Sequence, residues 1–213
     1  MQNNKKKLIL LNSPPEAGKD TIAKEFKKLY GFKPMEFKEP LYQAAADLIG
    51  WDVKAIKQLA TSRGTKETVL GFPFPLVPGG GEMKLLCTPR QFLIFTSEHV
   101  IKPLKGDKWF GRQLALKVKD NNTHVISDCG FPSEVAGLIE ELDKDYEIIV
   151  ARFTRKGFED FPLTDSRSWV TEDKVKPLLE SNKRRKVRYI DFTNDEEPKK
   201  VVENLIKKLK IEV

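Results

Sequence analysis

The stretch NSPPEAGKDT, residues 12–21, joins a short apolar run to an amphipathic segment. The run before it is KLILLN, residues 7–12, and the segment after it, residues 21–30, carries apolar side chains on one helical face (Ile22, Phe26, Leu29 and Tyr30). The expected order is strand, loop and helix. This order suits a phosphate site, because the loop amides and the helix N-terminus both point at a group above the strand end.

The loop departs at two positions from the phosphate-binding pattern of glycine, four residues and Gly-Lys-Ser/Thr. Ser13 stands at the first glycine and Asp20 at the hydroxyl residue, whereas Gly18 and Lys19 are retained. Ser13 fits the pattern only if its backbone avoids a strongly positive φ. The alternative is an ordinary strand-to-helix turn with a solvated lysine.

If the loop binds ATP, backbone amides and a few side chains make the contacts. The expected nucleotide-binding residues are Ser13, Glu16, Ala17, Gly18, Lys19, Asp20 and Thr21. Gly18 lets the backbone pass close to phosphate, and Lys19 is placed to bridge the β- and γ-phosphates. Asp20 is predicted to be a magnesium ligand, directly or through water, because a carboxylate beside a triphosphate needs a cation between them.

The rest of the chain alternates between helical and strand patterns, which predicts a parallel sheet covered on both faces. Glycine and proline are so dense in residues 62–84 that we expect a long loop or small flap there. Elsewhere the pattern predicts helices at 39–59 (interrupted at 50–52), 89–101, 107–119, 132–142 and 171–181, strands at 123–128, 146–153 and 187–192, and a final amphipathic helix.

Composition sets the class of protein. The 213 residues are 39% hydrophobic and 32% charged, as in an ordinary soluble domain, and no apolar run approaches a membrane span, so a cytoplasmic protein is expected. The net charge of +7 admits nucleic acid, an anionic membrane or a polyanionic small substrate as partner. The densest basic run, 183–188, is interpreted as a solvated connection between a helical stretch and a strand. Cys87 and Cys129 suggest neither a disulfide nor a zinc site.

Four stretches together resemble one family. They are GKDT (18–21), TPRQFLIFTSEHVIKPLKGDKWFGRQLA (88–115), VISDCGFPSEV (125–135) and DSRSW (165–169). In this order they resemble the deoxynucleoside monophosphate kinases of tailed bacteriophages. The resemblance implies one P-loop kinase domain over 1–213, of the three-layer αβα class, with a five-stranded parallel sheet, a helical substrate-binding insertion at about 33–105 and an arginine-bearing lid at about 154–170. It also implies transfer of the γ-phosphoryl group of ATP to a deoxynucleoside monophosphate, with Mg²⁺.

The resemblance assigns roles to residues beyond the loop. Arg90, at a helix start, is expected to bind the substrate phosphate with a two-pronged contact. Asp128 is expected to organise magnesium or its waters, or instead to cap the following helix. Glu134 would contact the substrate base or sugar, or simply suit a first helical turn. Trp109 and Arg112 would line the substrate pocket, unless the aromatic side chain belongs to the core.

The remaining expected residues lie around the lid and the last strand. Arg152, Arg155 and Arg167 bracket the lid, and one or two of them are expected to reach the transferring phosphate on closure. The sequence does not rank the three. Asn194 follows the last strand, where such kinases receive adenine, but with Glu197 it also reads as a helix cap.

The sequence is also compatible with three other functions. A kinase of the same fold acting on another acceptor, of the dephospho-coenzyme A or phosphomevalonate type, differs only in acceptor specificity. A nucleotide-dependent nucleic-acid-binding protein would bind DNA or RNA with a steep salt dependence. An inactive nucleotide-binding module would bind ATP without turnover. For the kinase we expect a deoxynucleotide substrate, no stable nucleic-acid or membrane partner, and a homodimer as one option.

Overall fold

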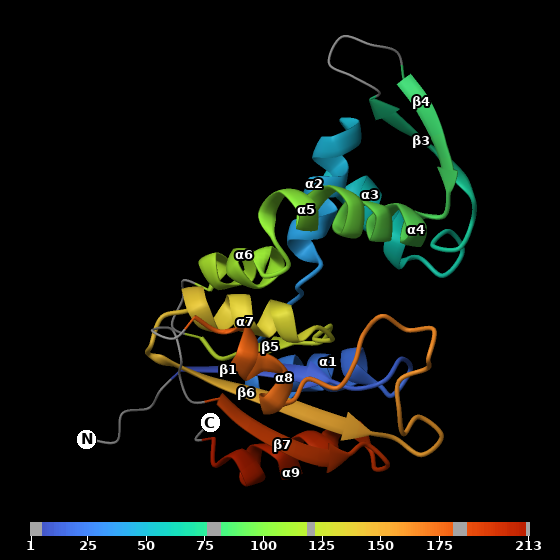
Figure 1. Cartoon of the computed structure of the whole chain (residues 1–213). Coiled ribbons are helices and arrows are strands. Elements are labelled where there is room, and N and C mark those ends of the chain that lie inside the picture. The colour runs from blue at the N-terminus through green and yellow to red at the C-terminus, as the bar shows by residue number, and fades with distance from the viewer. Residues whose placement is uncertain (1–5, 76–81, 119–121, 181–186, 212–213) are drawn as a thin grey trace. The chain divides into compact units, whose positions relative to one another are not determined.

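The computed structural model describes residues 6–75, 82–118, 122–180 and 187–211 (Figure 1). The chain divides into two compact units, one formed by residues 1–37 and 111–213 and the other by residues 38–110. Within the described residues, no helix is long and apolar enough to cross a membrane. The glycines at 79–81 and residues 183–186 of the basic run lie outside the described residues.

The first unit is built on a five-stranded sheet in the order β2-β5-β1-β6-β7. Its strands are β1 (Lys6–Asn12), β2 (Lys33–Met35), β5 (His124–Ile126), β6 (Tyr146–Thr154) and β7 (Val187–Thr193). All four pairings are parallel, and Ile9 of β1 lies between Val125 of β5 and Ile149 of β6. The predicted parallel sheet is confirmed. The short edge strand β2 was not expected.

Helices cover both faces of this sheet, so the predicted three-layer α/β fold is confirmed. Side chains alternate along β1: Leu8 and Leu10 enter one core and Ile9 and Leu11 the other. The first core is closed by α6 (Trp109–Lys117), α7 (Pro132–Glu141) and α8 (Glu172–Val175), and the second by α1 (Lys19–Tyr30) and α9 (Pro198–Leu209). Each fully buried leucine or isoleucine stabilises the fold by about 1.5–3 kcal/mol.

The order of the strands locates a binding edge. From β1 the chain passes through α1 to β2 on one side, whereas α7 carries it from β5, across β1, to β6. The two helices cover opposite faces, so connections diverge at the carboxyl end of β1. Open α/β sheets bind ligands at such a switch point. The stretch 12–21 lies there.

The second unit has its own core and is mainly helical. It contains α2 (Glu39–Ile49), α3 (Val53–Thr61), β3 (Leu70–Pro75), β4 (Glu82–Cys87), α4 (Pro89–Phe95), η1 (Thr96–Ile101) and α5 (Lys102–Lys105). Phe72 and Phe92 stack at its centre, with 4.4 Å between ring centroids. A capping box between Thr88 and Gln91 starts α4, the helix that was predicted to begin at residue 89.

One expectation about this unit is wrong. Residues 62–84 were expected to form no regular element, yet β3 and β4 pair as an antiparallel hairpin. A two-stranded sheet leaves one edge of each strand unpaired, so Pro73 can occupy β3 although it lacks an N–H.

In the first unit, the structure differs from the helix expected over 171–181. The segment forms α8 followed by the short 3₁₀ turn η2 (Lys176–Leu178).

Candidate active site

The loop between β1 and α1 has the backbone of an anion site. Glu16 (φ 63°) and Gly18 (φ 99°) adopt left-handed conformations. Left-handed residues in a loop can turn neighbouring N–H groups toward one anion. Ser13 is not among the described non-glycine residues with positive φ, so the condition for its replacing a glycine is met.

Lys19 lies back over this loop. Its Nζ donates hydrogen bonds to Ser13 O at 2.5 Å, Pro14 O at 2.8 Å and Ser13 Oγ at 3.2 Å. Pro14 lacks an amide donor, but its carbonyl helps to hold the ammonium group. The ammonium group of Lys19 is therefore held by the first residues of the same loop.

The first turn of α1 is left open for a ligand. The helix begins after Gly18, which has no side chain with which to cap it. Asp20 and Thr21 lie in this turn with exposed side chains. The unpaired N–H groups of a helix start and the positive end of its dipole both favour a phosphate.

Asn194 holds the loop from the opposite side. Its Nδ2 donates to Ala17 O at 2.7 Å, and its backbone N–H donates to Thr154 O at 2.8 Å. A Cβ at Gly18 would lie only 2.6 Å from Asn194 Nδ2. Both the positive φ and the nearby Asn194 amide therefore favour glycine at position 18. The alternative role for Asn194, capping α9, is not observed, because α9 starts after Glu197 without a side-chain cap.

Asn12 was missed by sequence reasoning. This fully buried side chain donates from Nδ2 to Cys129 O at 3.0 Å and Ser168 O at 3.1 Å, and its Oδ1 accepts the N–H of Val170 at 2.9 Å. It ties the end of β1 to the residues after β5 and to the end of the expected lid. The only signal in the sequence is a polar residue closing an apolar strand.

Asp128 follows β5, which pairs directly with β1 as expected. Its Oδ1 accepts the N–H of Phe37 at 2.9 Å. Helix α7 starts after Phe131, and the alternative that Asp128 caps this helix stays a prediction. Asp128 therefore stands at the same sheet edge as the loop.

Cys129 follows Asp128 in the chain, and its thiol is buried. Burial raises its pKa well above the usual value, the carboxylates of Glu134 and Asp128 raise it further, and Lys19 acts in the opposite direction. Lys19, Asp128 and Glu134 are thus the charged groups whose electrostatic effect reaches this thiol. The edge combines one cation with two carboxylates.

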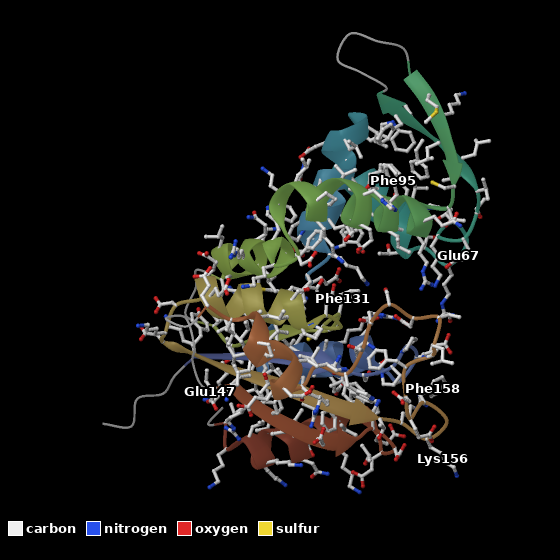
Figure 2. The ribbon with its side chains drawn as sticks, in the orientation of Figure 1. Glu67, Phe95, Phe131, Glu147, Lys156 and Phe158 are labelled. Carbon is white, nitrogen blue, oxygen red and sulfur yellow. The ribbon has the colours of Figure 1, made fainter. Side chains whose placement is uncertain are left out.

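The three arginines that bracket the expected lid have different surroundings. Arg152 forms a two-pronged ion pair with Asp191 on the neighbouring strand, at 2.8 and 2.7 Å. Arg155 is exposed and begins a tight turn in which the N–H of Phe158 donates to Arg155 O at 2.7 Å; Phe158 is labelled in Figure 2. Arg167 pairs with Asp165, Nε to Oδ1 at 2.9 Å and Nη2 to Oδ2 at 2.6 Å.

The expected substrate residues are distributed over both units. In the second unit, exposed Arg90 lies 3.5 Å from Glu67, and half-buried Trp109 stacks edge-on against Phe110. In the first unit, Arg112 pairs with the buried carboxylate of Glu140 at 2.9 Å.

Magnesium is compatible with the donors present. Within the described part of the chain, no three His, Cys, Asp or Glu side chains gather as a metal cage. A magnesium ion at a phosphate site needs only one or two protein carboxylates, with phosphate and water oxygens completing its octahedron. Asp20 in the first turn of α1 and Asp128 after β5 are carboxylates of that kind.

Comparisons with known proteins give distant matches in structure only. No protein-family model matches the chain, and no curated protein matches it either. An unliganded sugar kinase from Janibacter sp. HTCC2649 is similar at 11% identity and a TM-score of 0.37, covering 97% of this chain and 95% of its own. A kinase candidate from Chloroflexus aurantiacus J-10-fl is similar at 8% identity and a TM-score of 0.44, covering 97% of both chains. Both TM-scores are below 0.5, so the assignment of fold rests on the sheet order and the layers.

Proposed function

We propose that this protein transfers the γ-phosphoryl group of ATP to a deoxynucleoside monophosphate. The observation that carries the proposal is the loop at the carboxyl end of β1. Two left-handed residues, a helix start without a side-chain cap, and Lys19 meet there. These are the parts from which proteins build a site for a nucleotide polyphosphate.

The proposed reaction needs alignment and charge neutralisation more than covalent help. The loop amides from Glu16 to Thr21 would bind the phosphates. Lys19 would leave the carbonyls of Ser13 and Pro14 and move onto the β- and γ-phosphates. An oxygen of the acceptor phosphate then attacks the γ-phosphorus, the bond to the bridging oxygen breaks, and ADP leaves. Magnesium, held by Asp20 and Asp128 with phosphate oxygens, would supply further positive charge.

The acceptor is the part of the proposal that rests on the resemblance to phage kinases. Arg90 is proposed to bind its phosphate, with Glu134 and Trp109 at the base or sugar. Arg112 has a weaker case, because its guanidinium would have to leave the buried carboxylate of Glu140. Taking the guanidinium away from the Glu140 carboxylate, whose side chain is only 2% exposed, is costly because that charge is shielded from water.

The test is ADP release from Mg-ATP with each deoxynucleoside monophosphate, its ribose counterpart, and no acceptor. The Lys19→Ala variant serves as the control for contaminating kinases. Turnover with a deoxynucleotide that is lost in the variant supports the proposal. Turnover only with another phosphorylated or hydroxyl acceptor would overturn the substrate class, and ATP binding without any turnover would overturn the enzyme assignment.

A further inference from the structure

Arg167 is held by a buried carboxylate in a fixed orientation. Asp165 Oδ1 accepts both the backbone N–H and the Nε–H of Arg167 at 2.9 Å, and its Oδ2 accepts from Nη2 at 2.6 Å. The Asp165 side chain is 8% exposed and that of Arg167 is 23% exposed. A two-pronged contact fixes the plane of a guanidinium group and uses two of its five donors. Three donors remain for an anion.

The aliphatic part of Arg167 packs on Gly130, two residues after Asp128. A Cβ on Gly130 would lie 2.6 Å from Cγ, 2.8 Å from Cδ and 3.0 Å from Cβ of Arg167. The backbone is attached at the same place, because Ser168 N–H donates to Gly130 O at 3.0 Å. Asn12 in turn holds Ser168 O to the end of β1. Arg167 is therefore anchored beside both the loop strand and the strand that ends near Asp128.

Electrostatics agree with this placement. The hydrogen bond to Asp165 raises the pKa of Arg167, burial opposes the rise, and the charges of Asp128 and Glu134 add to it. The guanidinium group thus remains charged, and its side chain lies against Gly130, two residues from Asp128. An anionic phosphoryl group there would meet a cation already in place.

The other two arginines lack such an arrangement. Arg152 projects from a strand to a carboxylate that is 70% exposed, Asp191, on the neighbouring strand. Arg155 sits in an exposed turn. Of these three arginines, Arg167 alone combines a buried carboxylate partner, a glycine cleared for its side chain, and attachment to the end of β1.

We infer that Asp165 and Gly130 are positioning residues that hold Arg167 ready for the transferring phosphoryl group. The inference rests on the proposed phosphoryl transfer and deepens it by ranking Arg167 above Arg152 and Arg155. A preset arginine stabilises developing phosphate charge without reorganising during the reaction. Asp165 must hold Nε and Nη2 of Arg167 while the remaining N–H groups of the guanidinium contact phosphate.

The test is a double-mutant cycle on kcat with Mg-ATP and the best acceptor. We expect Arg167→Ala to lower kcat about 10³-fold, as for an arginine that stabilises a phosphoryl transition state. Gly130→Ala places a methyl group where the Arg167 side chain lies, and we expect it to lower kcat about 10–10²-fold by misplacement, with KM for ATP changed little. In the Arg167→Ala background, Gly130→Ala should have little further effect, since Cγ and Cδ of residue 167 are gone and only its Cβ remains, 3.0 Å from the added methyl.

Further variants separate positioning from a purely structural role. Asp165→Asn should lower kcat about 10-fold through a looser fork, and Arg167→Lys should restore only a small part of the activity, because lysine cannot make the two-pronged contact. Arg188→Ala, which breaks an arginine–carboxylate pair with Glu147 at 2.9 Å, controls for the loss of an ion pair. Gly64→Ala, with nothing nearer than 4.0 Å to an added Cβ, controls for the added methyl.

The outcomes are distinguishable. An inactive wild-type protein overturns the proposed function and this inference together. An active wild type in which the Gly130 and Arg167 effects multiply overturns the positioning role alone. If Arg167→Ala lowers Tm but leaves kcat unchanged, the ion pair between Asp165 and Arg167 only stabilises the fold, and the inference is overturned. A larger loss in kcat from Arg152→Ala or Arg155→Ala than from Arg167→Ala would overturn the ranking.

Discussion

Gly18→Ala tests the loop geometry most directly. Gly18 has φ 99°, and an added Cβ would lie 2.6 Å from Asn194 Nδ2. The left-handed backbone costs an alanine about 1–2 kcal/mol. Displacing the Asn194 amide from Ala17 O costs about 1 kcal/mol more, the net value of a hydrogen bond. The sum of about 2–3 kcal/mol corresponds, in a chain of this length, to a fall in Tm of about 4–12 °C.

Gly31→Ala is the matched control on the same helix. Gly31 ends α1 with φ 68°, and nothing lies within 4 Å of an added Cβ. Only the backbone cost applies, so we expect a loss of about 1–2 kcal/mol and an unchanged KM for ATP. The difference between the two variants isolates the contact with Asn194.

The assay combines thermal unfolding with KM for ATP. In addition to its lower Tm, Gly18→Ala should raise KM, because the loop amides lose their alignment. Asn194→Ala removes the side chain that the methyl group introduced by Gly18→Ala would strike, so the two substitutions together should cost less than the sum of their separate effects. Equal Tm values for Gly18→Ala and Gly31→Ala, with KM unchanged in both, would refute the view that Asn194 holds the loop.

Four further outcomes are expected. Lys19→Ala should lower kcat about 10²-fold or more with the fold intact; wild-type turnover in the variant would exclude a role for the lysine in phosphate binding. Asp20→Ala should raise the magnesium concentration needed for half-maximal activity, and an unchanged titration would remove it from the metal site. Gly111→Ala would place a Cβ 1.8 Å from the carbonyl oxygen of Glu134 in α7. Urea unfolding should therefore show that the free energy of unfolding falls by about 3 kcal/mol or more, whereas Gly64→Ala should change it little. Burial raises the pKa of Tyr189 to about 12, so its stabilising effect is complete below pH 10 and is lost as pH rises toward 12; urea midpoints of wild type and Tyr189→Phe that stay parallel from pH 9 to 11.5 would contradict this.

The sheet unit was readable from sequence because its signals are local. The apolar run before Asn12, the Gly18-Lys19 pair and the apolar face after Thr21 together specify strand, loop and helix. Continuous apolar strands separated by helices specify a parallel sheet with both faces covered. These patterns depend on neighbours within one or two turns of the chain, which a sequence shows directly.

The hairpin of the second unit could not be predicted from the sequence, and the reason is physical. Glycine and proline in residues 62–84 lower the intrinsic preference for any regular element. Pairing with β4 and the stack of Phe72 on Phe92 outweigh that preference. Long-range packing of this kind leaves no periodic trace in the segment itself.

Within the candidate site, the sequence by itself determined the loop, its lysine and the acid at the end of the adjacent strand. Only the tertiary structure decided what holds them. Asn194 reaches Ala17, Asn12 reaches Ser168, and the Arg167 side chain fills the space beside Gly130. Each of these contacts joins segments that are far apart along the chain and are brought together by the parallel sheet. A hydrogen bond or a steric limit between such segments depends on the register of the strands, and no local pattern of residues encodes it.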